Sequence, residues 1–173
     1  MQHTTERLTA SPRVLAGGMA AFRIFIGAIW ASNALAKLFG QSAFDWGFIS
    51  FTLVDRGSAR SILQDASATT FQPLRAIYQD LILANWGFFQ WFLTIAELAI
   101  AVSLLFGIAS RLGATAGLLL IGPIWIMLLH RNLYLWEYPL DLVPLLILAV
   151  VPAGRAFGLD GTLAARFRGR WPF

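Results

Sequence analysis

The sequence contains no cysteine and only two histidines, His3 and His130. Without cysteine there are no disulfides, no thiol redox chemistry and no Cys-ligated iron–sulfur, zinc or c-type haem site. A haem held by two histidines of one chain is disfavoured, because His3 lies in a polar tail. We therefore expect no haem, iron–sulfur cluster or metal, and any redox chemistry would use a bound organic carrier or a partner.

Charged residues are also scarce. They make up 13% of the 173 residues, whereas a soluble domain carries about a quarter. Hydrophobic residues make up 58%, and the mean hydropathy is +0.67. The apolar residues form runs long enough to cross a bilayer, which indicates an integral membrane protein in contact with lipid. The net charge of +4 comes from arginines of the kind that set membrane topology, and no basic segment has nucleic-acid spacing. We exclude a nucleic-acid partner.

Four apolar segments predict an all-α fold, an integral membrane four-helix bundle forming one transmembrane domain over residues 14–152. The predicted spans are 14–39, 86–106, 112–129 and 137–152. Residues 1–13 form a polar tail, and residues 153–173 form a basic tail. Arg23 interrupts the first run, which favours a membrane span over a cleaved signal peptide.

The connection 40–85 is the longest in the chain, and long connections tend to be functional. Residues 44–49 have the character of a membrane-surface segment. Further on, apolar residues recur at helical spacing after Pro73, which predicts a short amphipathic helix over 73–82. We interpret the whole connection as a lid.

Arginine is concentrated on one predicted side of the membrane. The tails and the turn between the second and third spans carry Arg7, Arg13, Arg111, Arg155, Arg166, Arg168 and Arg170. Because such an excess marks the cytoplasmic side, both termini are expected in the cytoplasm of a prokaryotic inner membrane. The connection 40–85 and the stretch 130–141 then face the outside or the periplasm.

Charges inside a span usually pair. Arg23 and Glu97 lie at similar depths from the inner surface, roughly 13–14 Å at about 1.5 Å per residue, so an intramembrane Arg23–Glu97 ion pair is predicted. This pair would be a helix–helix clamp, or Glu97 would relay protons at the floor of a cavity. Near the outer surface, Lys37 is expected to pair with Asp141, with Glu137 as the competing partner.

The stretch 130–141 combines ionisable and aromatic residues between two apolar runs. Together with the first span it predicts an outward-opening pocket lined by Trp30, Asn33, Lys37, His130, Trp136, Glu137, Tyr138 and Asp141. His130 has the only side chain here whose usual pKa suits proton exchange near neutrality. The alternative is that these residues are interfacial anchors, a snorkelling lysine and a helix cap.

Several motifs occur in a fixed order along residues 20–161. They are Arg23-x3-Gly27, Asn33-x3-Lys37-Leu38, Ala96-Glu97, Leu104-Leu105-Phe106-Gly107, the approach Trp136 to Asp141, and Gly154-Arg155-x2-Gly158-Leu159-Asp160. Because these motifs occur in this order, the chain resembles the DoxX/DoxD family of small four-helix membrane proteins. The DoxD branch is associated with thiosulfate:quinone oxidoreductase, in which a second subunit takes part.

The resemblance implies a quinone-linked oxidoreductase component that passes electrons from thiosulfate to a non-covalently bound quinone. Lys37 and Arg131 would then hold the small anionic donor, assisted by Arg56, Arg60 or Arg75 of the connection 40–85. Proton exchange with the quinone would be catalysed by His130, Glu137 or Asp141, and stacking on the ring would come from Trp30, Trp46 or Trp136. A complete thiosulfate enzyme would need a partner subunit.

Two other functions remain open from the sequence. One is that of a non-catalytic accessory subunit of a larger respiratory or other electron-transfer membrane complex, with the small-residue stripes and aromatic faces as docking surfaces. The other is that of a small-molecule transporter or lipid-binding protein, because gating also uses a lid and paired charges.

Overall fold

The computed structural model of the chain describes residues 11–129, 134 and 137–173, without the side chains of 138 and 139. The elements are, in order, α1 (Pro12–Phe39), β1 (Ala43–Asp45), β2 (Ser50–Thr52), α2 (Arg56–Thr69), α3 (Gln72–Ala76), the π-helix η1 (Ile77–Leu83), α4 (Trp86–Phe106), α5 (Ser110–Leu128), α6 (Glu137–Val150), the 3-10 helix η2 (Ala153–Arg155) and α7 (Asp160–Arg166). Within the described residues the fold is helical apart from one two-stranded hairpin, β1–β2.

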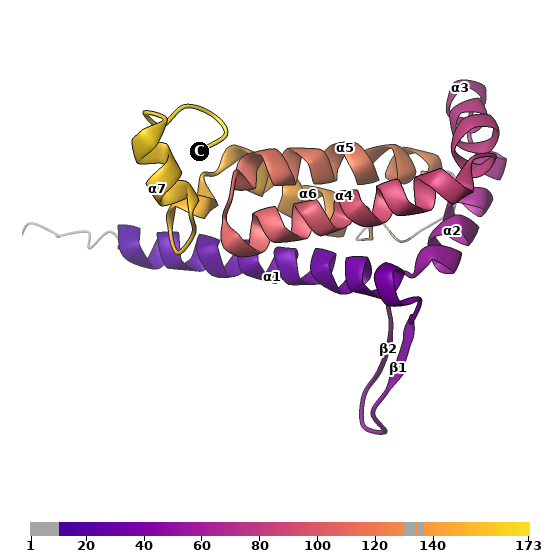
Figure 1. The fold of residues 1–173 in the computed structure, drawn as a ribbon, viewed down its shortest axis with the longest axis horizontal. Coiled ribbons are helices and arrows are strands. Elements are labelled where there is room, and N and C mark those ends of the chain that lie inside the picture. Colours follow the sequence, from indigo (N-terminus) through magenta and orange to yellow (C-terminus); the bar gives the residue numbers. More distant parts are fainter. Residues whose placement is uncertain (1–10, 130–133, 135–136) are drawn as a thin grey trace, which may run out of the picture.

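Three long helices, α1, α4 and α5, run alongside one another and form the body of the molecule (Figure 1). α1 packs along α4, while α5 packs on both α4 and α6. Each of the three is long and apolar enough to cross a membrane. Large side chains on their outward faces are exposed, including Phe25, Ile95 and Leu119. Extensive exposed apolar surface on helices of this length is what a lipid-facing helix presents.

The long helices follow the predicted apolar segments. α1, α4 and α5 coincide with 14–39, 86–106 and 112–129 to within two residues at each end. The fourth segment, 137–152, coincides with α6, which is apolar but has only 14 residues. A helix of that length extends about 21 Å, against roughly 30 Å for a hydrocarbon core.

The ends of α1 are set by local chemistry. Pro12 takes the first helical position after Ser11, whose hydroxyl accepts a hydrogen bond from the Val14 N–H. The helix ends at Gly40, whose φ of 68° is left-handed and whose N–H donates to the Ala36 carbonyl. A glycine adopts this conformation without the steric cost that other residues pay, so the chain leaves α1 here.

The connection 40–85 holds more structure than the predicted short helix. α3 and η1 together cover the predicted segment 73–82, and the hairpin and α2 precede them. α2 begins after Asp55, whose carboxylate accepts a hydrogen bond of 2.7 Å from the Ser58 N–H. Its buried side chains are small except for Leu63, which is why its apolar face is faint in the sequence.

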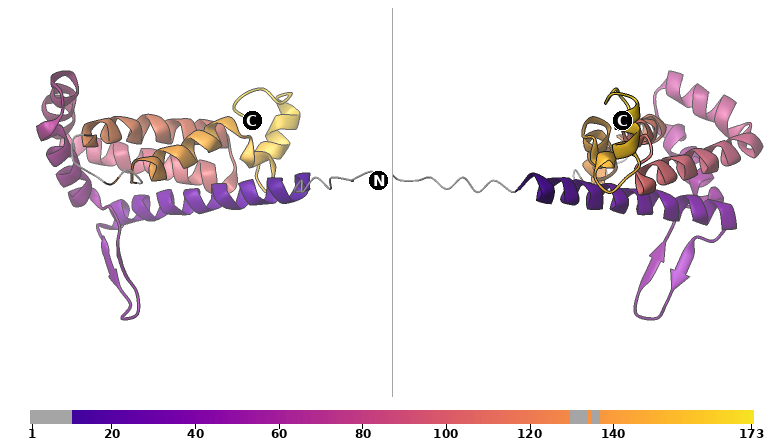
Figure 2. Two further views of the ribbon diagram at one scale, coloured as in Figure 1. Left: turned by 180° about the vertical axis from the view of Figure 1, so that it is seen from behind. Right: turned by 60° about the vertical axis from the view of Figure 1, so that its left-hand side comes forward.

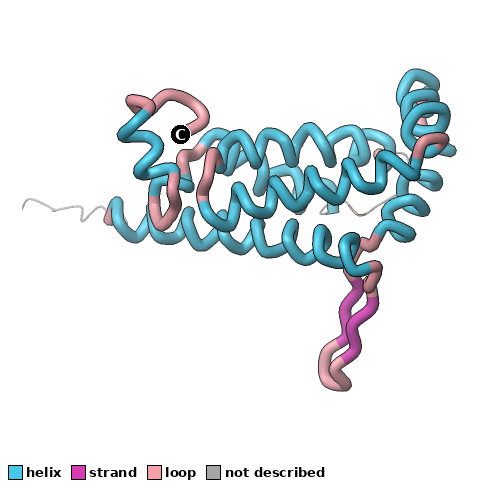
Figure 3. The backbone as a smooth tube through the Cα atoms, viewed as in Figure 1, coloured by secondary structure: helices cyan, strands magenta, loops and turns pink. Residues whose placement is uncertain are grey.

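Two apolar cores lie along the bundle. The larger one is formed by Ile26, Ile100, Leu104, Ala114, Leu145, Leu148 and Ala153. The other joins α2, η1 and α5 through Leu63, Ala66, Tyr78 and Met127. α2 and α3 therefore cover one end of the bundle, while α7 and the start of α1 lie at the other end (Figure 2). The hairpin stands apart from the helices, as Figure 3 shows.

Candidate functional site

A cavity of about 260 Å³ lies between α1, α2, α4, α5 and α6. Most of its lining is apolar, including Ala59, Ile62 and Leu63 on α2. Polar and aromatic side chains from four helices also reach it: Trp30, Asn33, Lys37, Glu97, Trp125 and Asp141. Concave, largely apolar pockets with a few convergent polar groups are the usual form of small-molecule sites.

Lys37 is the most buried charged group of this cavity. Its side chain is 2% exposed, and its Nζ lies 2.8 Å from Oε2 of Glu97, whose side chain is 12% exposed. The same Nζ donates a hydrogen bond of 2.8 Å to the Val54 carbonyl. A buried ammonium needs a partner charge and further acceptors to offset its desolvation, and Glu97 and Val54 supply both.

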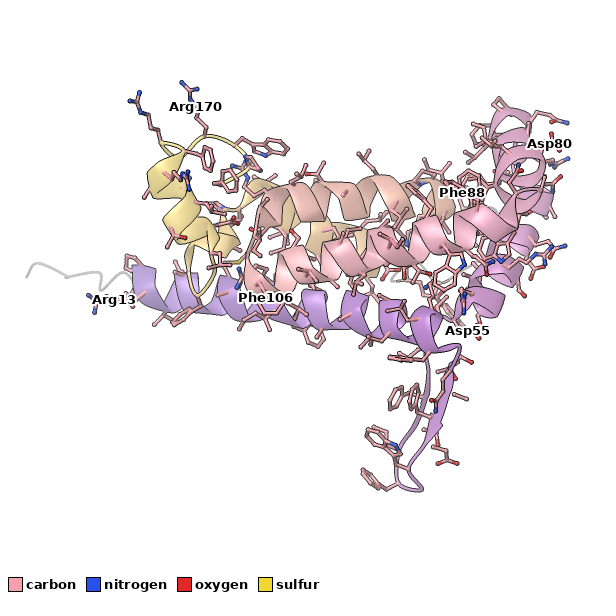
Figure 4. All side chains as sticks on the ribbon, in the orientation of Figure 1. Arg13, Asp55, Asp80, Phe88, Phe106 and Arg170 are labelled. Carbon is pink, nitrogen blue, oxygen red and sulfur yellow. The ribbon has the colours of Figure 1, made fainter. Side chains whose placement is uncertain are left out.

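Asn33 lies one helical turn before Lys37 and contacts the same residue of the connection. Its Oδ1 accepts a hydrogen bond of 3.0 Å from the Val54 N–H. Asn33 and Lys37 thus satisfy both main-chain polar groups of Val54, which fastens the start of α2 to α1. Figure 4 marks this junction by Asp55, the residue that caps α2. The predicted lid is therefore tied directly to the cavity wall.

Trp125 and Asp141 provide the second polar contact at the cavity. Trp125 Nε1 donates a hydrogen bond of 3.1 Å to Asp141 Oδ2, which joins α5 to the start of α6. Asp141 is exposed, so it lies at the rim, whereas Trp125 is half-buried. A tryptophan N–H inside an apolar helix needs an acceptor, and Asp141 fills that role.

The predicted Arg23–Glu97 pair is wrong, because Glu97 pairs with Lys37. The prediction assumed that α1 and α4 end in one plane at the inner surface. Instead α1 extends past the end of α4: Gly27 lies so close to Leu105 that a Cβ on Gly27 would be 2.9 Å from the Leu105 nitrogen. Moving outward along both helices from this contact brings Lys37 level with Glu97. The predicted Lys37–Asp141 pair is also wrong, because Lys37 contacts Glu97 and Val54, whereas Asp141 accepts its hydrogen bond from Trp125.

Arg23 belongs to a second cluster at the opposite end of the bundle. Its Nη2 donates a hydrogen bond of 2.9 Å to the Phe157 carbonyl, and its guanidinium is fully buried. Nη1 packs against Gly107 and Gly158, where an added Cβ would collide with it. The negative charge of the Asp160 carboxylate interacts electrostatically with this guanidinium.

Asp160 closes this cluster by capping α5. Its carboxylate accepts hydrogen bonds from the Ala109 N–H at 2.6 Å, the Ser110 N–H at 2.9 Å and the Ser110 hydroxyl at 2.6 Å. Negative charge at a helix N-terminus is favourable, so Asp160 joins the segment after α6 to the turn between α4 and α5. The sequence placed Asp160 in the basic tail, at the end of the Gly154–Asp160 motif, and predicted no contact for it. We interpret this second cluster as structural.

The other predicted site residues are dispersed. Trp46 lies in the hairpin and does not line the cavity, and Glu137 begins α6 without lining it either. His130, Arg131 and Trp136 lie outside the described residues, as does the side chain of Tyr138. Trp125 and Val54 were missed by sequence analysis. A tryptophan within a span was a usable signal, whereas a main-chain contact such as that of Val54 leaves no pattern in the sequence.

Arg56 and Arg75, two of the arginines expected to assist in holding the anion, already have contacts. The guanidinium of Arg56 lies 4.4 Å from the ring centroid of Trp91, and Arg75 Nη2 donates to the Thr70 carbonyl at 2.9 Å. Within residues 11–129, 134 and 137–173, no group of three acidic or histidine side chains is placed to hold a metal ion. The charged groups that line the cavity are Lys37, Glu97 and Asp141, and Lys37 is already paired with Glu97.

Comparison with family models, with curated proteins and with solved structures finds no match for this chain. The family resemblance thus remains a prediction from the motifs. Their residues fall in the two places just described: Asn33, Lys37 and Glu97 at the cavity, and Arg23 and Asp160 in the second cluster.

Proposed function

We propose that this chain is a DoxX/DoxD-like protein of a prokaryotic inner membrane whose cavity binds the headgroup of a quinone. The observation that carries the proposal is the cavity itself, with apolar walls and two separate carboxylates, Glu97 and Asp141. An engineered apolar cavity of about 150 Å³ binds benzene. A cavity of about 260 Å³ accordingly has room for one substituted ring, with the isoprenoid tail leaving towards lipid.

The polar groups suit both redox states of a quinone. A quinone carbonyl accepts hydrogen bonds. The Asn33 amide nitrogen is a donor at the wall, and the Trp125 N–H would donate to the quinone by exchanging its present acceptor, Asp141. A hydroquinone hydroxyl donates, and Glu97 and Asp141 are acceptors that also transfer protons. Trp30 lines the same cavity and offers a ring for stacking.

The proposed reaction couples this site to thiosulfate oxidation. Two thiosulfate ions form one S–S bond and release two electrons, and the quinone takes up these electrons with two protons to give the hydroquinone. Lys37 is already held by Glu97 and Val54, so it has little charge left for an anion. We therefore assign donor oxidation to a second subunit, with Arg60 and Arg131 of this chain assisting in the binding of the anion.

The proposal includes α6 as a fourth span, with both termini in the cytoplasm. α6 packs along α5, and its outward residues Leu140, Leu146 and Val150 are exposed as on the longer helices. A short span is accommodated by local thinning of the bilayer. α7 and the start of α1 lie at the same end of the molecule (Figure 2). Among the described residues, Arg13, Arg155, Arg166, Arg168 and Arg170 belong to these segments or flank them, which favours the cytoplasm for that end.

The test is to purify the protein in mild detergent, extract it with organic solvent and measure bound quinone by mass spectrometry. We expect about one quinone per chain, with at least a tenfold lower content in Glu97→Gln and Asp141→Asn. Asp80→Asn, an exposed carboxylate outside the cavity, is the matched control. Folded protein without quinone, or equal quinone in all variants, would contradict the proposal. Thiosulfate-dependent reduction of a soluble quinone, with and without co-purifying subunits, then tests the donor.

A shallow groove between α4 and α5 supports the accessory-subunit function as second candidate. It has a volume of about 580 Å³ and is floored by the small residues Ala96, Ala99, Ser103, Gly113 and Ala116. Small residues let a neighbouring helix approach closely in a membrane. If this function holds, the protein is empty of quinone and Ala99→Leu breaks its co-purification with other subunits. Release of a different small molecule on extraction would instead favour a transporter or lipid-binding protein.

A further inference from the structure

The hairpin β1–β2 separates aromatic from polar side chains. The strands pair antiparallel, with Phe44 opposite Phe51 and Asp45 opposite Ser50. Successive strand residues point to opposite faces. The rings of Phe44 and Phe51 stack at 5.2 Å, and Trp46 meets Phe51 edge-on at 5.7 Å. One face is therefore aromatic, and the other carries Asp45 and Ser50.

The polar face is ordered by contacts of its own. Asp45 Oδ1 accepts hydrogen bonds from the Gly47 N–H at 2.9 Å and the Ser50 hydroxyl at 3.0 Å. These bonds lower the pKa of Asp45, the backbone bond from Gly47 contributing most. The carboxylate therefore stays charged at neutral pH, so this face favours water or lipid headgroups over hydrocarbon.

The aromatic face is unusually open. Trp46 is 63% exposed and Phe48, at the tip, is 89% exposed. The hairpin is fixed at its base, where the Leu53 N–H donates to the Ser42 carbonyl at 2.7 Å. From this base it runs across the axis of α1 and away from the other helices (Figures 1 and 2). If α1 spans the membrane, a hairpin in this orientation lies parallel to the bilayer surface.

The position of the hairpin along the membrane normal is set by the end of α1. It starts just beyond Gly40, and Phe39, the last residue of α1, is 78% exposed. The lipid-facing surface of α1 is thus continuous with the hairpin. In Figure 4 the rings of the hairpin project to the side along which the helices run, while oxygen atoms project to the other. Rings facing the hydrocarbon with polar groups facing water is the arrangement of an interfacial segment.

We infer that the hairpin is an in-plane membrane anchor, with Phe44, Trp46, Phe48 and Phe51 inserted at the headgroup–acyl boundary of the outer leaflet. Trp is enriched at this level, and Trp and Phe are common on the apolar face of segments that lie in the interface. The hairpin is also connected to the cavity. β2 continues through Leu53 to Val54, which is hydrogen-bonded to Asn33 and Lys37 of the cavity wall. The inference rests on α1 spanning the membrane, and not on the identity of the cavity ligand.

The cysteine-free chain allows a direct test by single-cysteine spin labelling. Nitroxide labels are placed at Phe48→Cys on the tip, Ser50→Cys on the polar face and Phe25→Cys on the outward face of α1. The protein is reconstituted in vesicles of phosphatidylcholine and phosphatidylglycerol. Collisions of each label with oxygen, which concentrates in lipid, and with a water-soluble nickel chelate are then compared. Trp46→Cys reports on the same aromatic face if Phe48→Cys does not fold.

We expect the Phe48 label to meet oxygen at least three times more, relative to the nickel chelate, than the Ser50 label does. Equal nickel access at both positions would overturn the anchor. Exclusion of both reagents at Phe48 would also overturn it, because a protein partner would then cover the hairpin. Nickel access at Phe25 would show that α1 does not span, a failure distinct from that of the hairpin alone.

Discussion

At the scale of single residues, the buried Lys37 determines how the cavity is built. It joins α1 to α4 through Glu97 and to the start of α2 through Val54. The Glu97 oxygen in this contact has no other partner among the described residues. Lys37 and Glu97 therefore neutralise each other inside the protein, and the removal of either charge should destabilise the fold.

We predict that Lys37→Met and Glu97→Gln each lower the free energy of unfolding by about 3–5 kcal/mol, because each strands a buried charge. The double variant should recover part of this loss, since neither charge is then left alone. Denaturant unfolding in detergent measures all three variants. Additive losses in the double variant would show that the pair is not coupled.

A second prediction concerns Asp55, the cap of α2 outside the membrane. The hydrogen bond from the Ser58 N–H is the main cause that lowers the pKa of Asp55, and the charge of Lys37 contributes less. Because the folded-state pKa lies below the unfolded one, near 3.9, the stabilisation is complete above about pH 4 and is lost as the pH falls through the folded-state pKa.

Asp55→Asn keeps a capping side chain but removes the charge. The stability of the wild-type protein should fall more steeply than that of Asp55→Asn as the pH is lowered from 6 to 2.5. Asp65→Asn, an exposed position of α2, should leave the wild-type slope unchanged. Parallel curves for Asp55→Asn and wild type would contradict the assigned role.

At the scale of elements, the contact between α1 and α4 decides which charges meet. A Cβ on Gly27 would lie 2.9 Å from the backbone nitrogen of Leu105 and 3.1 Å from the Leu104 Cβ. Backbone cannot move aside as a flexible side chain does. Gly18, in the same helix, has no atom within 4 Å of an added Cβ.

These two glycines make a matched pair. Gly27→Ala should lower the unfolding free energy by roughly 1–3 kcal/mol, because it overpacks the contact. Gly18→Ala should be neutral or stabilising by up to about 1 kcal/mol, as expected for helix propensity. Thermal unfolding in detergent compares them. Equal effects would mean that α1 and α4 do not approach closely at Gly27.

At the scale of the whole molecule, the two ends of the bundle should face different compartments. Asp80 lies on the end that holds α3, and Arg170 lies on the end that holds α7 (Figure 4). In spheroplasts, a membrane-impermeant thiol reagent should modify Asp80→Cys and spare Arg170→Cys until the cells are lysed. The opposite pattern would invert the topology, and modification of both in intact spheroplasts would mean an even number of spans between them.

The sequence was sufficient to locate the long helices, because uninterrupted apolar runs mark them independently of their neighbours. It was not sufficient for the register between them. Depth counted from the ends of the predicted spans paired Glu97 with Arg23, whereas the contact of Gly27 with Leu105 brings Lys37 level with Glu97. α2 was missed because it buries mainly alanine and serine, which carry little hydrophobic signal.

Around the cavity, the sequence singled out Trp30, Asn33, Lys37 and Asp141, and the structure brings these four together. Intramembrane polar residues are costly, so they stand out in any apolar segment. The contribution of α2 and the position of Trp125 depend on tertiary packing between segments far apart in the chain, which local patterns do not encode.

The double contact on Val54 has a consequence for how this protein tolerates variation. Asn33 contacts the N–H of Val54 and Lys37 contacts its carbonyl. Every amino acid supplies this carbonyl, and every one except proline supplies the N–H. In a saturation library scored by folded abundance, position 54 should accept most residues except proline, whereas positions 33 and 37 should accept few. The loop is then free to diverge among related chains, while the two helix residues that hold it stay fixed.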